Sequence, residues 1–247
     1  VYSYNELKNI KDINKFFDIK PEGNWEGKII LDEINEPNEL IINKLLEIRK
    51  KRKKPFFDSK TQLDLNCLWI SSLVSLHSIL PNENYLKTAE DFFEKIEIKY
   101  LNKKIFHSYL EDISFIEDYA FLIQSLLDLA DATMNPKYKI LAKEYCDEVI
   151  IKFFDKDKKI FQKNEKDKND LFTNPFDISD NTVPNGNSVM LLNFSRLGYL
   201  NNAKELAESM NGYLNIYKSF MISSLKSLDF FNEIKNGKSC TIEGCKI

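Results

Sequence analysis

The strongest constraint on the fold is a helical alternation that begins at Asp58. Segments that are apolar on nearly every side alternate with segments that carry a single apolar stripe. The predicted pairs are 62–80 with 85–100, 115–130 with 136–154, and 188–197 with 201–214, and a further helix covers 216–231. A helix that is apolar all round is normally buried on all sides, so the first kind forms an inner layer and the second an outer layer. Helix hairpins repeated roughly every 50 to 70 residues predict a helical array or a closed α/α toroid.

The region before this alternation is less regular. Residues 1–19 predict a short helix with Ser3 or Asn5 as its cap, and 38–54 predict another helix. Between them lies a turn-rich loop, 21–27, whose two glycines indicate backbone geometry that other residues resist. We expect a single domain with N-terminal helices and a loop over 1–57, three hairpins and a further helix over 58–231, and a tail over 232–247.

The composition favours a predominantly α-helical protein. Only seven glycines and seven prolines occur among 247 residues, and runs of alternating polarity are few, which disfavours an all-β sandwich or barrel. The formal net charge of -3 gives no reason to expect a nucleic-acid partner. The one basic run, 49–54, closes a predicted helix, where cations favour the negative end of the helix dipole.

The four cysteines fit no zinc or thioredoxin spacing. Cys67 and Cys146 fall in predicted helices, and we expect them to be core residues in a reducing compartment. Cys240 and Cys245 could ligate a metal or pair, but a second pair of ligands is lacking. We therefore expect neither a metal nor another cofactor. The sequence has no signal peptide and no apolar run long enough to cross a bilayer, which predicts a cytoplasmic protein without a membrane partner.

The two longest connections, 101–113 and 155–187, each join an outer helix to the next inner helix. All inner helices therefore start at one rim, and loops gathered on one rim of a rigid scaffold are where sites are usually built. Within these connections, 105–109 and 159–162 each predict a short strand.

Two adjacent carboxylates lie at the N-terminal end, here called the mouth, of the second apolar helix, in the stretch 114–120. Ser114 and Glu117 have the spacing of a capping box, which predicts that Glu117 satisfies a backbone N–H of the first turn. Asp118 lies about 100° further round the helix and is not needed for that box. Asp118 is therefore the first candidate for a role in a cavity.

The mouths of the first and third apolar helices repeat this theme. Ser59 and Gln62 also have capping-box spacing, which leaves Asp58 available for another role. At the third helix, Asn187 or Ser188 is a natural cap. If the inner helices converge, side chains from all three mouths approach one rim.

Paired acids at such a rim could act as general acid and base on a sugar ring. The catalytic candidates are Asp118, Asp58 and Glu117. His107 lies in the loop before the acidic mouth, where a proton carrier would be well placed. Tyr119 could stack on the face of a sugar, although aromatic residues at such positions are more often packing residues.

Four local motifs resemble those of one known family. Gly23-Asn24-Trp25-Glu26-Gly27 resembles a GNFEG element, and Arg49 through Lys60 resembles R-x-x-R-x-x-P-x-x-DDK. Phe115 through Ile123 resembles FLEDYAFLI, and Pro184 through Val189 resembles PSGNSV. The family is that of the thioredoxin-domain-containing proteins of the spermatogenesis-associated protein 20 type and their bacterial relatives. The likeness is spread along most of the chain.

The sequence departs from this family at the first apolar helix. Ser59 stands where the family has the second Asp of DDK, and Leu65-Asn66-Cys67 stands where it has WNG. Only Asp58, Lys60 and Asn66 carry over from that region. The candidates for ligand binding are Lys60, Asn66, Tyr119, His107 and Asn187.

The resemblance implies the C-terminal part of a six-hairpin α/α toroid, similar to those of sugar epimerases and glycosidases. In the family this toroid follows a thioredoxin-like domain, which this sequence does not contain. We therefore expect an all-α, incomplete toroid that binds or acts on a carbohydrate or another small molecule through carboxylates at its rim. The alternative is a non-catalytic helical scaffold or binding module that works with a thioredoxin-like domain of the same protein, and the departures favour that alternative.

Overall fold

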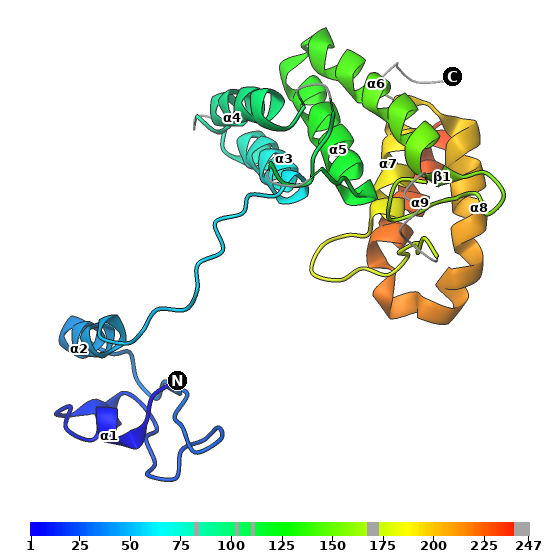
Figure 1. The fold of residues 1–247 in the computed structure, drawn as a ribbon. Coiled ribbons are helices and arrows are strands. Elements are labelled where there is room, and N and C mark those ends of the chain that lie inside the picture. The colour runs from blue at the N-terminus through cyan, green and yellow to red at the C-terminus, as the bar shows by residue number, and fades with distance from the viewer. Residues whose placement is uncertain (82–83, 102–103, 110–111, 167–172, 240–247) are drawn as a thin grey trace. The chain divides into compact units, whose positions relative to one another are not determined.

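The computed structural model divides the chain into two compact units, Val1–Ser59 and Lys60–Ile247 (Figure 1). It describes residues 1–81, 84–101, 104–109, 112–166 and 173–239. The boundary falls two residues beyond the subdivision expected at 57. Each unit has its own buried apolar cluster.

The first unit contains α1 (Tyr4–Leu7), a short 3-10 helix (Ile13–Lys15) and α2 (Glu39–Lys50). The helix predicted over 1–19 is wrong in length, because Asp12 adopts a left-handed backbone conformation with φ 63° that no continuous right-handed helix accommodates. Ser3 is the cap of α1, as one of the two alternatives held. Asn38 caps α2 by accepting from the Ile41 N–H at 3.0 Å.

The predicted loop over 21–27 depends on one glycine. Gly23 has φ +77°, and a Cβ atom there would lie 2.4 Å from the carbonyl oxygen of Lys28. Any other residue would therefore clash with the backbone across the turn. The turn is followed by Ile29, which pairs with Tyr2 in an isolated antiparallel bridge and is buried in the core of the first unit.

The second unit carries the predicted helical alternation. Its elements are α3 (Leu63–Ile79), α4 (Tyr85–Tyr100), α5 (Ile116–Thr133), α6 (Pro136–Phe153), β1 (Phe154–Asp155), β2 (Ile160–Phe161), α7 (Gly186–Leu197), α8 (Leu200–Tyr217), a 3-10 helix (Lys218–Phe220) and α9 (Ile222–Lys235). The helix predicted over 216–231 begins later than expected, because α8 and the 3-10 helix extend through its first five positions.

The apolar helices form the inner layer. Helix α5 packs against α3 on one side and α7 on the other, and α9 packs against α7. The striped helices α4, α6 and α8 pack against α3, α5 and α7 in turn (Figure 1). The inner-and-outer arrangement predicted from the alternation is confirmed.

Helix α3 is more exposed than the sequence predicts. Leu65 is 48% exposed and Trp69 is 46% exposed, whereas α5 buries nearly all its apolar side chains. The reason is that α3 is the first inner helix of the second unit and has an inner neighbour, α5, on one side. The edge of Trp69 packs on Phe92 of α4 with ring centroids 4.6 Å apart.

Short extended segments join the helices. The strand predicted over 159–162 is present as β2, which pairs antiparallel with β1 through Phe154 and Phe161. The strand predicted over 105–109 is reduced to a single bridge between Gln62 and Ser108. That bridge ties the connection before α5 to the start of α3.

Two further expectations concern cysteines and membranes. Cys67 and Cys146 are free and buried in the helical core, as predicted, whereas Cys240 and Cys245 lie outside the described residues. Within the described part of the chain, no helix is long and apolar enough to span a bilayer.

Candidate functional site

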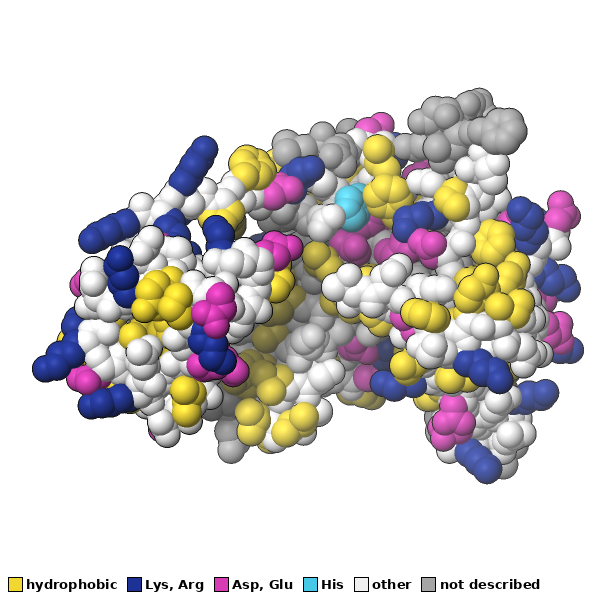
Figure 2. Space-filling model, turned by 90° about the horizontal axis from the view of Figure 1, so that it is seen from below, with side chains coloured by type: hydrophobic (Ala, Val, Ile, Leu, Met, Phe, Trp, Pro, Cys, Tyr) yellow, Lys and Arg dark blue, Asp and Glu magenta, His cyan; other side chains and the backbone are white. Residues whose placement is uncertain are grey.

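A cavity of about 300 Å³ lies where the inner helices begin. It is lined by side chains from the start of α3, from the loop before α5, from the first turn of α5, from Lys163 and from residues within 177–185. Its charged and titratable side chains are those of Asp64, His107, Glu117, Lys163 and Asp177. On the face seen in Figure 2, acidic side chains gather beside a histidine. The prediction that loops and helix mouths meet at one rim is confirmed for the second unit.

His107 is held by hydrogen bonds at both ring nitrogens. Its Nδ1 atom lies 2.9 Å from Oδ1 of Asp118, and its Nε2 atom lies 2.8 Å from Nε2 of Gln62. A carboxylate can only accept, so Nδ1 carries the proton and, in the neutral ring, Nε2 accepts from the Gln62 amide. The ring also packs edge-on against Phe115, with centroids 5.0 Å apart. The imidazole therefore lies in one orientation at the cavity wall.

The backbone of His107 is fixed as firmly as its ring. Its N–H donates to the carbonyl of Ile113 at 2.7 Å, and its carbonyl accepts from the N–H of Leu63 at 2.9 Å. The second bond satisfies one of the N–H groups that a helix leaves without a partner in its first turn. The start of α3 and the loop before α5 are thus joined through this one residue.

Asp118, not Glu117, closes the first turn of α5. Its Oδ2 atom accepts from the Phe115 N–H at 2.8 Å, while Oδ1 faces His107. The capping box predicted from Ser114 and Glu117 is wrong, because the helix is capped one residue later, at Phe115. Ser114 instead donates through Oγ to Glu165 at 2.6 Å. Asp118 is wholly buried and does not line the cavity itself. It contacts the His107 ring, and that ring lines the cavity.

Glu117 consequently takes the position at the cavity. Burial raises the pKa of its carboxyl above the ordinary value, and the positive charge of Lys163 offsets part of that effect. Lys163 itself is paired with Asp177, with Nζ and Oδ2 2.6 Å apart. A carboxyl whose pKa is raised retains its proton closer to neutral pH and is suited to act as a general acid.

Asp64 is a site residue that the sequence analysis does not single out. It lies in the first turn of α3, and burial, followed by the charge of Asp118, raises the pKa of its carboxyl. Its position is equivalent to that of Glu117, since both are the second residue of an inner helix. That equivalence is the signal in the sequence that could have identified it.

Asp64, His107 and Asp118 also deserve consideration as metal ligands, because one donor atom from each lies within 4.8 Å of the others. Both oxygens of Asp118 are already engaged, one by the His107 ring and one by the Phe115 N–H. A metal ion bound to Nδ1 of His107 would have to displace the proton that Asp118 accepts. The bonds that Asp118 makes orient the imidazole of His107 and leave neither carboxylate oxygen without a partner.

Two predicted ligand-binding residues are buried among protein atoms. The Tyr119 hydroxyl donates to Glu148 of α6 at 2.7 Å and accepts from Lys152 at 3.0 Å. Asn187 accepts from the Phe161 N–H and donates to the carbonyls of Phe161 and Asp177. Both side chains are wholly buried and lie outside the cavity lining.

The predicted cap of α7 is also displaced. Asn185, rather than Asn187 or Ser188, caps this helix, and it accepts from the Ser188 N–H at 2.9 Å. Gly186 follows it, and a Cβ atom there would lie 2.9 Å from Cγ2 of Ile116. The starts of α5 and α7 approach so closely that glycine is required between them.

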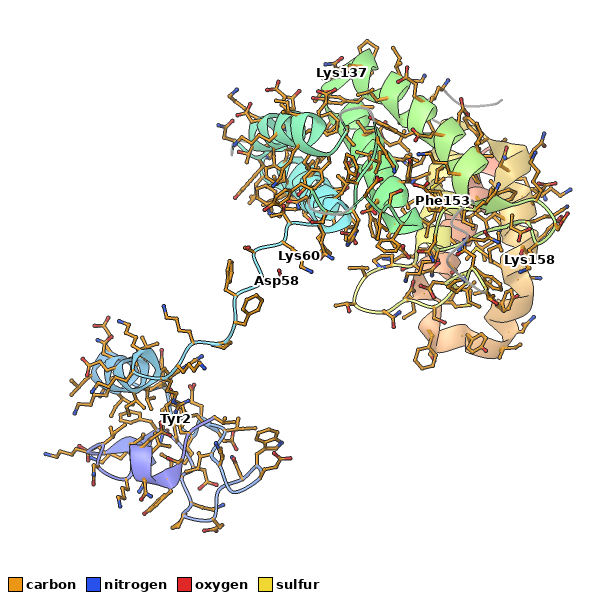
Figure 3. The ribbon with its side chains drawn as sticks, viewed as in Figure 1. Tyr2, Asp58, Lys60, Lys137, Phe153 and Lys158 are labelled. Carbon is orange, nitrogen blue, oxygen red and sulfur yellow. The ribbon has the colours of Figure 1, made fainter. Side chains whose placement is uncertain are left out.

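Three further candidates lie before α3 or in its first turns. Asp58 belongs to the first unit and Lys60 to the second, and both are exposed on the extended segment that Figure 3 shows. The capping box predicted from Ser59 and Gln62 is wrong, because α3 begins at Leu63 with Gln62 itself as the cap position. Asn66 donates to the Gln62 carbonyl.

An inner layer of apolar helices, an outer layer of striped helices and a cavity at the rim where the inner helices begin define an incomplete α/α toroid. Solved structures of other proteins share this fold, and two of them are the following. One is a GH76 α-mannanase from Bacteroides thetaiotaomicron, with a TM-score of 0.58 and 15% identity over 80% of this chain. The other is a cellobiose 2-epimerase from Bacillus thermoamylovorans, with a TM-score of 0.52 and 11% identity over 73% of this chain.

The matched region spans 63% of the mannanase and 62% of the epimerase. The likeness therefore concerns part of each of those proteins. No protein-family model and no curated protein sequence matches the chain.

Proposed function

We propose that the second unit binds a carbohydrate in the cavity at the rim and that Glu117 and His107 carry out general acid–base chemistry on it. The observation that carries this proposal is that a carboxyl which favours its proton and an oriented imidazole line one cavity. Burial favours a proton on the Glu117 carboxyl, and the buried Asp118 holds the His107 ring with its Nε2 lone pair directed at Gln62. A protonated carboxyl can act as a general acid, and an imidazole with a free lone pair can act as a general base.

The roles follow from the hydrogen bonds. A sugar hydroxyl that replaced the Gln62 amide at Nε2 could give its proton to His107, and Asp118 would stabilise the resulting imidazolium. When that hydroxyl is the anomeric one, Glu117 would donate its proton to the ring oxygen as the bond between C1 and that oxygen breaks, and the sugar ring opens to the aldehyde. Asp64 supplies a second carboxylate at the cavity, so the paired acids become Asp64 and Glu117. Asp118 acts as a positioning residue because it reaches the cavity through His107.

The fold supports a carbohydrate as the ligand. Both solved structures named above are of proteins whose names state action on sugars, and both share the α/α toroid. We further propose that the chain is related to the thioredoxin-domain-containing proteins of the spermatogenesis-associated protein 20 type. In support, Gly23 is required in the GNFEG-like turn, and Asn185 and Gly186 of the PSGNSV-like motif build the start of α7.

A second candidate function is a non-catalytic binding module that works with a thioredoxin-like domain. The observation that favours it is at the start of α3. Leu65, at the position of the family's tryptophan, is 48% exposed and lies outside the cavity lining. Without an aromatic side chain at this position, the start of α3 offers less surface for stacking on a sugar.

The test compares ligand binding by the wild-type chain, Glu117→Gln and His107→Gln. Thermal shifts are measured with glucose, mannose, cellobiose and N-acetylglucosamine. The control is Glu144→Gln, which changes an exposed acid on α6. We expect a sugar to raise the melting temperature of the wild type and of Glu144→Gln more than that of either cavity variant. Equal shifts in all four proteins, or none in any, would refute the sugar site.

A further inference from the structure

The cavity contains more negative charge than it can neutralise. Asp64, Glu117 and Asp177 bring three carboxyl groups, and Lys163 is the one Lys or Arg side chain that lines the cavity in the described part of the chain. Lys163 is already paired with Asp177 at 2.6 Å. Asp64 and Glu117 therefore remain without a salt bridge among the described residues.

The environment of these two carboxyls opposes their ionisation. Burial is the largest cause of the raised pKa in each, and the neighbouring charge of Asp118 adds to it in both. Partly buried carboxylates are stabilised either by taking up a proton or by contact with a cation. A ligand that brings a positive charge into the cavity would replace the proton on Asp64.

The helix ends at the rim act in the opposite direction. Residues at the starts of α3, α5 and α7 line the cavity, and the N–H groups of a helix start favour anions. Side chains of the protein already accept from some of these N–H groups. Asp64 accepts from the Leu65 N–H, Asp118 from the Phe115 N–H, and Asn185 from the Ser188 N–H. The pKa of Glu117 is raised although its own backbone N–H lowers it. The desolvation of the carboxylate thus outweighs the helix end.

We propose that the cavity selects a sugar that carries a protonated amine, and that it discriminates against sugar phosphates and uronic acids. The amine would lie against the carboxylate of Asp64, Glu117 would keep the proton that it donates, and the sugar hydroxyls would contact the polar side chains of the loop 179–185. An anionic sugar would add a further negative charge to the same volume. This inference rests on the carbohydrate site proposed above and names the class of its ligand.

The test measures binding by isothermal titration calorimetry with matched sugars. The amino sugars are glucosamine and mannosamine, the neutral sugars are glucose and mannose, and the anionic sugars are glucose 6-phosphate and glucuronate. The proteins are the wild-type chain, Asp64→Asn, Glu117→Gln and the exposed control Glu144→Gln. We expect an amino sugar to bind about tenfold more tightly than its neutral counterpart, since charge complementarity chiefly sets specificity.

Asp64→Asn should reduce that preference by about threefold or more, whereas Glu117→Gln, which replaces a protonated carboxyl by another neutral group, and Glu144→Gln should retain it. Equal affinity for amino and neutral sugars, or tighter binding of an anionic sugar, would overturn the charge selection and leave the carbohydrate site standing. Binding of none of the six sugars would overturn the charge selection, and the carbohydrate site itself would fall if cellobiose and N-acetylglucosamine also gave no thermal shift. A parallel titration with calcium chloride tests the other cation, and calcium that binds and displaces glucosamine would assign the carboxylates to a metal.

Discussion

Nδ1 of His107 lies 2.9 Å from Oδ1 of Asp118, and the second oxygen of the same carboxylate accepts from the Phe115 N–H at 2.8 Å. One buried side chain thus starts helix α5 and orients the imidazole at the cavity wall. Stability and site geometry are coupled in this residue, since each oxygen performs one of the two tasks.

Replacing Asp118 should reveal both tasks. Asparagine offers one acceptor to two donors, Phe115 and His107, and alanine offers none. We expect Asp118→Asn to lower the free energy of unfolding by about 1–2 kcal/mol and Asp118→Ala by about 3 kcal/mol, from a lost cap and unsatisfied buried donors. Urea denaturation followed by tryptophan fluorescence measures this, with Trp25→Phe as background so that Trp69 reports on the second unit.

The matched control for Asp118 is Asp229→Asn, which changes an exposed acid on α9 and should alter the free energy of unfolding by less than about 0.5 kcal/mol. If Asp118→Asn behaved like this surface control, the double role of the carboxylate would be excluded.

Glu117 should make the stability of the second unit depend on pH. Its folded pKa lies above the ordinary value of 4.5, chiefly through burial. Below pH 4.5 both states hold the proton, and as pH rises through the folded pKa the unfolded state is favoured because it ionises more easily. We therefore expect Glu117→Gln to gain stability relative to wild type as pH increases from about 4 to 7.

Denaturation at a series of pH values, again in the Trp25→Phe background, measures the difference between wild type and Glu117→Gln. Glu144→Gln serves as the exposed control for the same chemical change. If Glu117→Gln instead lost stability relative to wild type as pH rises, the folded protein would favour the carboxylate, contrary to the expected effect of burial.

The helical alternation could be predicted from the sequence because it depends on local periodicity. Helix α4 has the predicted bounds, 85–100, and the other hairpin helices differ by a few residues at their ends. The helix predicted over 1–19 fails for a different reason. Its apolar residues do become buried, but Asp12 turns the backbone after α1, and periodicity does not report a left-handed residue.

The site could be predicted only in part. The rim and two of its residues, His107 and Glu117, follow from the order of helices and loops. The roles of Glu117 and Asp118 are exchanged because the helix is capped one residue later than the capping motif indicates, and a shift of one residue turns each side chain by about 100°. The ion pair of Lys163 with Asp177 forms within a long connection, where no periodic signal places side chains.

Replacing two glycines by alanine should have opposite effects on stability, because one lies at the contact of α5 and α7 and the other has open space around it. Gly186→Ala would bring a Cβ atom to 2.9 Å from Ile116 and should destabilise the second unit by about 1–3 kcal/mol. Gly212→Ala lies within α8 with no atom within 4 Å of the added Cβ and should stabilise by about 0.5–1 kcal/mol. Thermal and urea denaturation of both variants tests this, and stabilisation of Gly186→Ala would show that α5 and α7 can separate at little cost.

Asn187 separates a structural role from the ligand-binding role that the sequence predicts. It accepts from the Phe161 N–H and donates to the carbonyls of Phe161 and Asp177, so Asn187→Ala leaves buried backbone groups without partners. We expect a loss of about 3 kcal/mol in the free energy of unfolding, against less than about 0.5 kcal/mol for Asn201→Ala, an exposed asparagine on α8 outside the cavity lining. Denaturation and sugar titration are measured on the same preparations. Normal stability in Asn187→Ala together with lost sugar binding would assign Asn187 to the ligand, because a side chain that only supports the backbone cannot be removed without a cost in stability.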